Sequence, residues 1–487
     1  MALTHTQALV LAAGKSSRFK TGKSKLLEPL CGKPIIAHSL ATLKKLSIPT
    51  TVIVGFQKKA LIEAISSYQK DISFVEQKEQ NGTGHALMIS KEAWNTDTLL
   101  VLNGDMPLVT QDIIEQLHAT HQQKNASISF VTAHNCEPIA ASYGRIVQDD
   151  NSIAIVEAKE FKGDITENCC INAGIYLINK KFLEESMQQL TQSSVTSEWY
   201  ITDLVKIASD QKLTIATISA PFDRIRGINT FKELWAAEQI LKADIINHWM
   251  NNGVRFSIAH NVHIDSDVTI GAGTVIESGA QLHGATTIGK NCSIGAFSII
   301  TESTLSDTVI VHPHTIISNS KVEDNAQIGP FAHVAEQSHI HDHAIVGNFV
   351  EIKRSTIGSY SKTKHLSYIG DTIMQERVNI GAGTITCNYD GTNKHQTVIE
   401  SDAFIGSNNT LIAPLTIHKN AYTAAGSTLT QDVPENALAL ARTKQIIKPD
   451  YAHKLKTRNQ DVKKHQEKEL DQHFFGAVKS TNFETHS

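Results

Sequence analysis

The stretch IDSDVTIGAGTVIESGAQL, residues 264–282, decides the fold of a long part of this chain, from Ile264 to Leu429. An aliphatic residue returns there at every sixth position, as Ile264, Ile270, Ile276 and Leu282, and the same period resumes over residues 322–352 and 399–429. A period of six matches neither the 3.6 residues per turn of an α-helix nor the simple alternation of a half-buried strand. It is typical of a parallel β-helix of hexapeptide repeats, whose aliphatic side chains stack inward as one column.

Length and composition limit the class of protein. A chain of 487 residues suggests two or three domains, and 41% hydrophobic with 19% charged residues describes a globular protein. A net charge of −4 argues against general nucleic-acid binding. The sequence contains no long apolar run, so we expect no membrane span, and its start reads as a strand rather than a signal peptide. Six scattered cysteines without metal-ligand spacing favour reduced thiols in a cytoplasm.

Residues 1–230 show a different pattern, in which apolar strand-like runs alternate with helical ones. Examples are ALVLAAG followed by PIIAHSLATLKKL, and TLLVLNGDMPLV followed by TQDIIEQLHATHQQ. This alternation predicts a Rossmann-like α/β domain with a parallel sheet, helices on both faces and ligands beyond the carboxyl ends of the strands.

Three loops after predicted strands carry the residues that we expect to bind ligands. Residues 11–19, with Lys25 shortly after, combine small residues with positive charge, as a phosphate site needs. Residues 77–85 form a second small-residue turn that could enclose a flat base, and Asp105 stands at the end of a buried run where Mg²⁺ on phosphates would lie. Taken singly, each loop is also compatible with plain turn or capping chemistry.

Together with later motifs, these loops resemble a known family. The later motifs follow in the family's order. They are YGR at 143–145, IVEAK at 155–159, INAG at 171–174, WYITD at 199–203 and GIN at 227–229. Over residues 6–442 the chain is similar to the bacterial bifunctional N-acetylglucosamine-1-phosphate uridyltransferases/glucosamine-1-phosphate N-acetyltransferases. The resemblance implies a nucleotidyltransferase domain at 1–230, a linker helix at 231–251, a left-handed parallel β-helix at 252–442 and a charged tail at 443–487.

The resemblance also implies roles for single residues of the first domain. The uridine nucleotide would be held by Leu11, Ala12, Ala13, Gly14, Lys25, Gln77, Gly82 and Thr83. The N-acetyl sugar would contact Gly144, Glu157, Asn172 and Asn229, and Mg²⁺ would bind Asp105 and Asn229. The implied reaction is attack of N-acetylglucosamine 1-phosphate on UTP, for which positioning and charge neutralisation suffice.

In the β-helix, two irregular stretches interrupt the period of six. HLSYIGD at 365–371 and NIGAGTITCNYDG at 379–391 resemble the acetyltransferase half of the same family. His365 suits the base that deprotonates an amine at neutral pH. By resemblance, Glu351 and Asn388 would orient His365 or the amine. The sugar phosphate would contact Lys353, Tyr368, Asn379 and Lys394, and acetyl-CoA would contact Ala382, Tyr389, Ser407, Ala425 and Arg442. In the family these sites form between neighbouring subunits, which implies a homotrimer.

One departure from the family bears on the acceptor. Where relatives read GPFARLRPG, this chain reads GPFAHVAEQ at 329–337, so Ala335 takes the position of the phosphate-binding arginine. A charge-assisted hydrogen bond is worth about 1.5–3 kcal/mol, or roughly 10- to 100-fold in affinity. Lys353, Arg354 or His333 are the cations that could compensate.

Three functional hypotheses follow. The first is a cytoplasmic two-site enzyme that makes UDP-N-acetylglucosamine for peptidoglycan and lipopolysaccharide from glucosamine 1-phosphate, acetyl-CoA and UTP. The second is a uridyltransferase alone, whose β-helix only assembles the trimer or acts on another amine. The third, a non-catalytic sugar-nucleotide sensor, is disfavoured by Lys25, Asp105 and Asn229.

Overall fold

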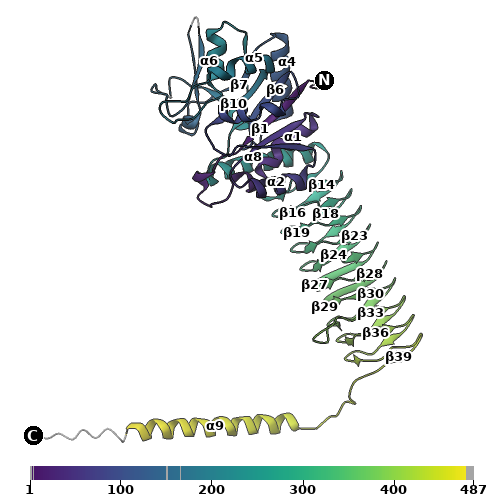
Figure 1. Ribbon diagram of the computed structural model, residues 1–487. Helices are drawn as coiled ribbons and strands as arrows, with labels where there is room; N and C mark the ends of the chain where they lie inside the picture. The colour runs from purple at the N-terminus through teal and green to yellow at the C-terminus, as the bar shows by residue number, and fades with distance from the viewer. Residues whose placement is uncertain (1–2, 4, 150–151, 165, 479–487) are drawn as a thin grey trace, which may run out of the picture.

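The computed structural model describes residues 3, 5–149, 152–164 and 166–478. An α/β part at the N-terminus sits on one end of a long column of stacked coils, and helix α9 (Tyr451–Val478) extends away from the other end (Figure 1). The side chains of residues 451–470 are exposed along this helix. Within the described part of the chain, no helix is long and apolar enough to cross a membrane.

A nine-stranded sheet, with the main order β11-β7-β10-β6-β1-β4-β5 and the β8–β9 hairpin paired to β10, forms the first part. Its strands are β1 (Thr6–Ala12), β4 (Thr50–Val54), β5 (Ile72–Glu76), β6 (Thr98–Asn103), β7 (Ile128–His134), β8 (Arg145–Gln148), β9 (Ile153–Val156), β10 (Cys170–Asn179) and β11 (Ile215–Ser219). A small hairpin adds β2 (Pro29–Leu30) and β3 (Lys33–Pro34).

The expectation of a parallel sheet holds for only part of it. Strands β1, β4, β5 and β6 pair in parallel, as do β7 and β11. Strand β10 lies between β6 and β7 and is antiparallel to both. A strand that is buried on both faces shows a continuous apolar run whichever way it points, so the run CINAGIYLIN could not indicate its direction.

Helices pack on both faces of this sheet, as the two apolar clusters on either side of it show. They are α1 (Ile35–Lys45), α2 (Lys58–Tyr68), α3 (Thr83–Ile89), α4 (Gln111–Gln123), α5 (Lys180–Ser186), α6 (Asp203–Asp210) and α7 (Phe222–Ile225).

Helix α8 (Phe231–Asn251) joins the two parts of the molecule. Leu234 and Leu241 pack against the core of the α/β part, whereas Ile245 and Trp249 pack against the core of the coils. Thr230 caps its start, with Oγ1 accepting from Glu233 N at 3.2 Å, and Glu233 Oε2 accepts from Asn229 N at 2.7 Å. These bonds resemble a capping box and hold the residue that precedes the helix.

The rest of the chain winds into a parallel β-helix. Neighbouring strands on successive coils pair in parallel, and in most coils partners lie 17 or 18 positions apart, as in Thr308 with Asn325 and Asn261 with Gly279. One 19-stranded sheet contains β12 (Arg255–Phe256), β13 (His263–Ile264), β15 (Val275–Ile276), β16 (Gln281–His283), β18 (Ser293–Ile294), β19 (Ile299–Thr301), β21 (Ile310–Val311), β22 (Ile316–Ser318), β24 (Gln327–Ile328), β25 (His333–Ala335), β27 (Ile345–Lys353), β29 (Lys362–Gly370), β31 (Asn379–Ile380), β32 (Ile385–Cys387), β34 (Phe404–Ile405), β35 (Thr410–Ile412), β37 (Tyr422–Thr423), β38 (Thr428–Leu429) and β39 (Leu438–Ala439).

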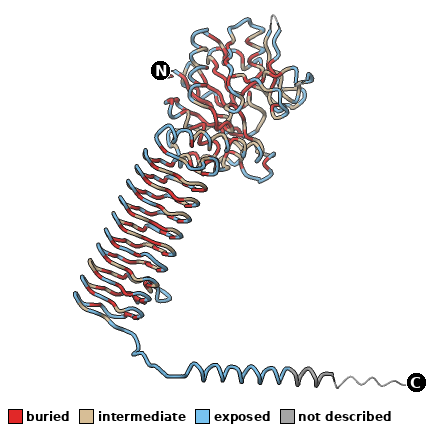
Figure 2. Tube along the Cα trace, turned by 180° about the vertical axis from the view of Figure 1, so that it is seen from behind, coloured by how far each residue is buried: buried red, intermediate tan, exposed pale blue. Residues whose placement is uncertain are grey.

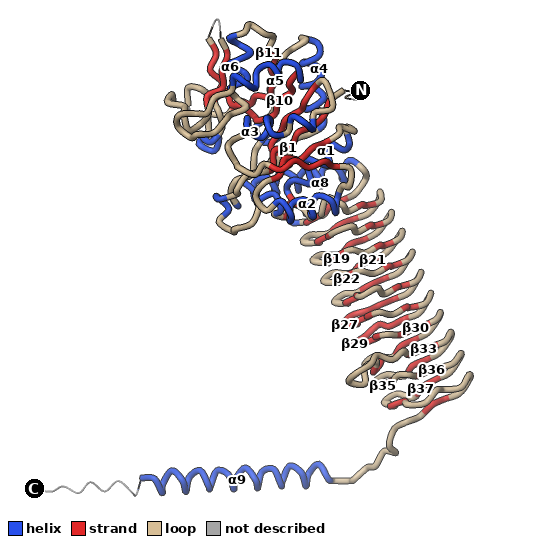
Figure 3. Tube along the Cα trace, viewed as in Figure 1, coloured by secondary structure: helices blue, strands red, loops and turns tan. Residues whose placement is uncertain are grey.

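A second sheet of nine strands closes the coils on the remaining side. It contains β14 (Thr269–Ile270), β17 (Thr287–Ile288), β20 (Thr304–Leu305), β23 (Lys321–Val322), β26 (His339–Ile340), β28 (Thr356–Ile357), β30 (Thr372–Met374), β33 (Thr397–Ile399) and β36 (Leu415–Ile417). The period-six aliphatics form one continuous core, with residues such as Ile276, Ile294 and Ile405 at 0% exposure. Figure 2 shows this core as buried segments that recur in coil after coil, and Figure 3 shows the short strands and long loops of each coil.

One cysteine pair contradicts the expectation of reduced thiols. Cys136 and Cys169 form a disulfide although 33 positions separate them. Their neighbours His134 and Cys170 are paired in the antiparallel ladder of β7 and β10, which brings the two cysteines together. The sequence spacing could not predict this contact, because it depends on the direction of β10.

Candidate active sites

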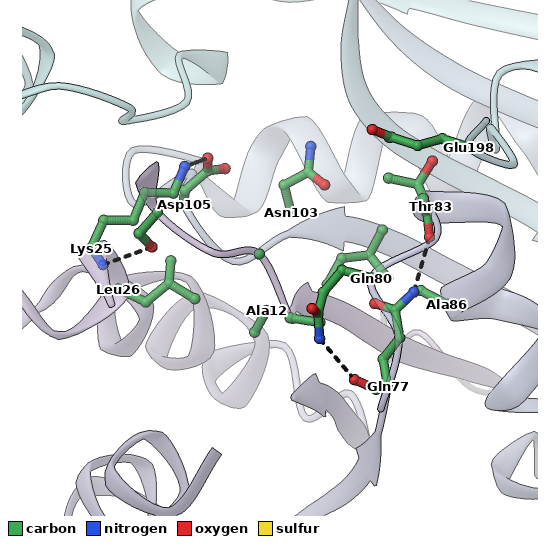
Figure 4. Close-up of a pocket in the computed structure, with 15 residues that line it drawn as sticks. Ala12, Lys25, Leu26, Gln77, Gln80, Thr83, Ala86, Asn103, Asp105 and Glu198 are labelled. Carbon is green, nitrogen blue, oxygen red and sulfur yellow. Dashed lines mark hydrogen bonds and ion pairs between the residues drawn. The ribbon is translucent and has the colours of Figure 1, made fainter. Parts of the chain in front are cut away.

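A cavity of about 320 Å³ opens at the carboxyl ends of β1 and β6. These strands are in register with Leu11 opposite Asn103, and Gly104 N donates to Leu11 O at 2.9 Å, so their loops lie side by side. All eight residues that the sequence predicts for the nucleotide line this cavity, and so does Asp105. Figure 4 labels Asp105 and four of the eight, which are Ala12, Lys25, Gln77 and Thr83. The loops therefore converge on one site, although the role of each residue stays a prediction.

Lys25 points across this cavity at the two predicted metal ligands. Its Nζ lies 2.5 Å from Asp105 Oδ2 and 2.6 Å from Asn229 Oδ1, and Arg18 Nη2 donates to Asn229 Oδ1 at 2.7 Å. Ile228 N donates to Asp105 O at 3.0 Å, which holds the loop of Asn229 against that of Asp105. One carboxylate oxygen and one amide oxygen thus converge on the Lys25 ammonium group. This donor set fits Mg²⁺, which takes one or two protein oxygens and leaves its other positions to phosphates and water.

The predicted base-binding turn is closed by Trp199 and Ile201, to which the sequence assigned no role. Trp199 O accepts from Gly84 N at 2.8 Å, and Ile201 N donates to Thr83 Oγ1 at 3.0 Å. A Cβ on Gly82, whose φ is +103°, would lie 2.3 Å from Trp199 O, so only glycine fits there. Gln77 Nε2 donates to Gly82 O at 3.1 Å and presents its buried amide group at this turn. The WYITD motif at 199–203 is the sequence feature that could have indicated this contact.

Three of the four predicted sugar residues, Gly144, Glu157 and Asn172, form a chain of contacts, whereas the fourth, Asn229, contacts Lys25 and Arg18. Asn172 N donates to Gly144 O at 2.9 Å, and a Cβ on Gly144 would touch the backbone of Glu157. Glu157 Oε1 accepts from Thr202 Oγ1 at 2.8 Å. Burial raises the pKa of Glu157 above its ordinary value, although the hydrogen bond from Thr202 opposes this effect.

His365 lies on β29, opposite Asn348 on β27. Its Nδ1 is 2.9 Å from Asn348 Oδ1, and because an amide oxygen only accepts, this contact assigns the proton to Nδ1. Nε2 is then left as the basic atom of an exposed imidazole. Asn348 is a contact that the sequence analysis missed, since it lies a whole coil away with a separation of 17 positions.

The predicted acetyl-CoA residues of three successive coils stack at the same corner of the β-helix as His365. Gly383 N donates to Leu366 O, Asn408 N to Ala382 O and Gly426 N to Ser407 O, at 2.7–2.9 Å. Arg442 Nη1 donates to Ala425 O at 2.9 Å and so ends the column. Ala382, Ser407, Ala425 and Arg442 are thus aligned along one edge, which leads to His365.

Two of the four predicted acceptor residues, Lys353 and Tyr368, lie near a different corner. Lys353 is in register with Ala335 on one coil and with Gly370 on the next. A Cβ on Gly370 would lie 2.5 Å from Tyr368 Oη and 2.8 Å from Asn388 Nδ2, so this glycine lets the two side chains meet. Asn388 Nδ2 donates to Asp371, and Arg354 donates to Asp371 Oδ1 and Oδ2 at 2.7 and 3.0 Å.

The remaining predicted residues lie between and beyond these corners. Glu351 is in register with Tyr368, and its Oε1 lies 4.0 Å from His333 Nδ1. Tyr389 and Lys394 form a bridge in a loop that adds residues to one coil, where partners are 25 positions apart, as in Arg377 and Asp402. Asn379 is in register with Lys362 on β29.

His365 comes directly before the corner at Leu366, whose φ is 44°, whereas the acceptor corner is the next one along the chain, at Asp371, whose φ is 48°. Gly370 lies five positions after His365, which sets an upper limit of about 16 Å at about 3.3 Å per residue. Asn388 lies beside Tyr368 and Asp371 rather than beside His365. Within one chain the predicted base therefore does not face the predicted acceptor residues.

Comparisons with known proteins agree with both halves of this arrangement. A family model described as the MobA-like NTP transferase domain matches residues 8–155, and one described as bacterial transferase hexapeptide (six repeats) matches 267–302 and 319–354. The bifunctional protein GlmU of Exiguobacterium sibiricum is 41% identical over 91% of this chain and 99% of its own length. Those of Koribacter versatilis and Clostridioides difficile are 38% and 37% identical, over 91% and 92% of this chain and 96% and 97% of their own lengths. The chain therefore belongs to the family of bifunctional GlmU proteins.

Proposed function

We propose that this protein makes UDP-N-acetylglucosamine in two steps, at two separate sites. The β-helix transfers an acetyl group from acetyl-CoA to glucosamine 1-phosphate, and the α/β part then joins N-acetylglucosamine 1-phosphate to the uridylyl group of UTP. The observation that carries the proposal is the convergence of all eight predicted nucleotide residues and Asp105 around one cavity, in which Lys25 bonds to Asp105 and to the nearby Asn229. Membership of a bifunctional family supports the pairing of this site with one on the β-helix.

At the first cavity the chain acts by positioning and by charge. The backbone of residues 11–14 and the turn at Gly82 would hold the nucleotide, and the Lys25 ammonium would neutralise its phosphates. A phosphate oxygen of the sugar 1-phosphate attacks the α-phosphorus of UTP, and pyrophosphate leaves. Asp105 and Asn229 would hold Mg²⁺, which supplies further charge neutralisation when it is bound. Glu157 would accept hydrogen bonds from the N-acetyl sugar, and Asn172 would donate hydrogen bonds to it.

On the β-helix, His365 Nε2 would remove a proton from the amine as its nitrogen attacks the thioester carbonyl of acetyl-CoA. The amide forms, the carbon–sulfur bond breaks and coenzyme A leaves as the thiol. Asn348 would keep the proton on Nδ1 and so keep Nε2 free to act as the base. The aligned corner from Ala382 to Arg442 would bind acetyl-CoA.

A homotrimer would complete this second site. Because His365 and the Lys353–Asn388 group lie at different corners of the β-helix, a neighbouring copy would bring its own acceptor corner against His365. We place the protein in the cytoplasm, where UTP and acetyl-CoA are available.

The experiment that tests the proposal measures both half-reactions on one preparation. We expect release of pyrophosphate from UTP and N-acetylglucosamine 1-phosphate in the presence of Mg²⁺, and release of thiol from acetyl-CoA with glucosamine 1-phosphate. Asp105→Asn should lower pyrophosphate release by on the order of 100-fold, because it removes charge that faces the phosphates, and should leave thiol release unchanged. His365→Ala should do the reverse. Loss of both activities in either variant would show misfolding rather than a role at one site.

A second candidate, a uridyltransferase without acetyl transfer to glucosamine 1-phosphate, is favoured by one observation. Ala335 stands at the position of the family's phosphate-binding arginine. Normal pyrophosphate release without any thiol release would establish this candidate instead.

A further inference from the structure

The two cations of the acceptor corner, Lys353 and Arg354, already form ion pairs with two carboxylates. Glu336 Oε1 lies 2.7 Å from Lys353 Nζ, and Glu336 Oε2 pairs with Arg354. Arg354 also donates twice to Asp371, which in turn accepts from Asn388. The formal charges of Lys353 and Arg354 are therefore balanced by those of Glu336 and Asp371, so the pair of cations offers little net charge to an incoming phosphate.

The β-helix brings these side chains together by stacking coils. Ala335 pairs with Lys353 across the sheet, so Glu336 and Arg354 are the next residues at the same corner of successive coils. Both have a left-handed backbone, with φ of 53° and 47°, as residues at this corner do. Glu336 is the most exposed member, at 49%, against 32% for Lys353 and 27% for Arg354. Its carboxylate can therefore return to water without disrupting the core.

We propose that Glu336 sets the acceptor specificity of the acetyltransferase site by competing with the acceptor's phosphate for Lys353 and Arg354. This inference rests on the proposed function of the β-helix. The chain has lost the arginine at the position of Ala335 and has gained an acid one residue later, and both changes disfavour a dianionic group at the same place. The site consequently distinguishes poorly between an amino-sugar phosphate and an amino sugar that lacks the phosphate.

The Glu336 carboxylate and the acceptor's phosphate carry charges of the same sign and therefore repel each other. A phosphate that approaches Lys353 must either displace the Glu336 carboxylate or bind beside it. Exposed ion pairs of this kind are weak, because water screens them, so the effect of one carboxylate on phosphate affinity is moderate. Replacement of Glu336 by an uncharged residue of the same shape should strengthen phosphate binding by about three- to tenfold.

The test compares Glu336→Gln with the wild type for two acceptors. We expect the KM for glucosamine 1-phosphate to fall by about three- to tenfold, with kcat for thiol release unchanged, while the KM for glucosamine stays the same. Glu302→Gln is the matched control, since Glu302 is an exposed acid at the same corner, two coils earlier, with a φ of 47°. It removes an equal charge without touching Lys353, and both constants should stay at the wild-type values.

The dependence on Lys353 makes the test specific. In a Lys353→Met background, Glu336→Gln should lose most of its benefit, because no ammonium remains to be freed. An unchanged or higher KM for glucosamine 1-phosphate in Glu336→Gln would overturn the proposal, as would an equal gain with and without Lys353.

A binding measurement keeps the inference separate from the proposed activity. Calorimetric titration with glucosamine 1-phosphate would be done in saturating UDP-N-acetylglucosamine, which fills the nucleotide cavity. If no variant releases thiol but Glu336→Gln binds glucosamine 1-phosphate more tightly than the wild type, Glu336 acts as inferred and acetyl transfer to this acceptor fails. If binding is equally weak in both, the role of Glu336 is refuted.

Discussion

Glu157 combines two properties that normally oppose each other, burial and an ionisable carboxyl group. It lies in the α/β part, close to Gly144, where burial raises the pKa of its carboxyl group and Thr202 Oγ1 donates to it at 2.8 Å. The folded protein thus binds a proton on Glu157 more tightly than the unfolded chain does. The stability from this group is complete below the unfolded pKa and is lost as the pH rises through the folded pKa. Above its folded pKa the ionised Glu157 therefore costs stability, which a hydrogen-bonding sugar would offset.

The first prediction concerns this carboxylate. Glu157→Gln should raise the thermal midpoint at pH 7 and should raise the KM for N-acetylglucosamine 1-phosphate by about tenfold, because a charged acceptor of hydrogen bonds is lost. In the wild type the same KM should increase as the pH falls through the raised pKa of Glu157, and in the variant this dependence should disappear. Steady-state kinetics from pH 5 to 8 and thermal unfolding check both. A variant that is less stable at pH 7 than the wild type would contradict the argument.

The second prediction concerns Asn348, which we interpret as a positioning residue for His365. Asn348→Ala should lower kcat for acetyl transfer by about tenfold with little change in KM, since Nδ1 loses its acceptor and the ring its orientation. Asn348→Asp should retain more activity but shift the acid limb of the pH–rate profile to higher pH, because a carboxylate stabilises the protonated imidazole. Uridyl transfer in the same preparations serves as the control. Identical pH profiles for the two variants would indicate a merely structural role.

Residue contacts differ in how far the sequence could predict them. Lys25 and Asp105 were predicted for one site because both follow strands whose carboxyl ends meet, and the structure brings them together. Asn348 and Glu336 could not be predicted in this way, because their contacts depend on the register between coils. A cluster formed by stacking leaves no spacing signal until the number of residues in each coil is known.

At the scale of elements, the period of six predicted the coils because one side chain in each hexapeptide must point inward. Strand β22 displays both environments on adjacent residues, with Ile316 at 43% exposure and Ile317 at 0%. By contrast, β10 could not be oriented from its sequence, and the extra residues around Tyr389 were visible only as a break in the period. Periodicity therefore predicts which way a side chain faces but neither the direction of a buried strand nor the shape of an insertion.

The third prediction uses that pair of isoleucines. Ile317→Ala should lower the free energy of unfolding by about 2–5 kcal/mol, because it leaves a cavity between two coils that cannot collapse onto it. Ile316→Ala, on the same strand and of the same chemistry, should cost less than about 1 kcal/mol. Urea unfolding followed by circular dichroism measures both. Equal costs for the two variants would mean that the column of inward side chains does not carry the stability of the β-helix.

At the scale of the whole molecule, the arrangement of the second site leads to the fourth prediction. His365 precedes the corner at Leu366, whereas Asn388 bonds to Asp371 at the next corner, so we expect a site that needs both to take them from two copies. His365→Ala and Asn388→Ala should each be nearly inactive in acetyl transfer alone. When the two are unfolded together, refolded and allowed to assemble at random, an interface with His365 from one variant and Asn388 from the other arises in about one quarter of cases, and thiol release should recover to about that fraction. Mixing without refolding should give no recovery if the trimer does not exchange subunits. If the refolded mixture also stays inactive while uridyl transfer returns in full, the site lies within a single chain and His365 would have to reach Asn388 by a rearrangement of β29.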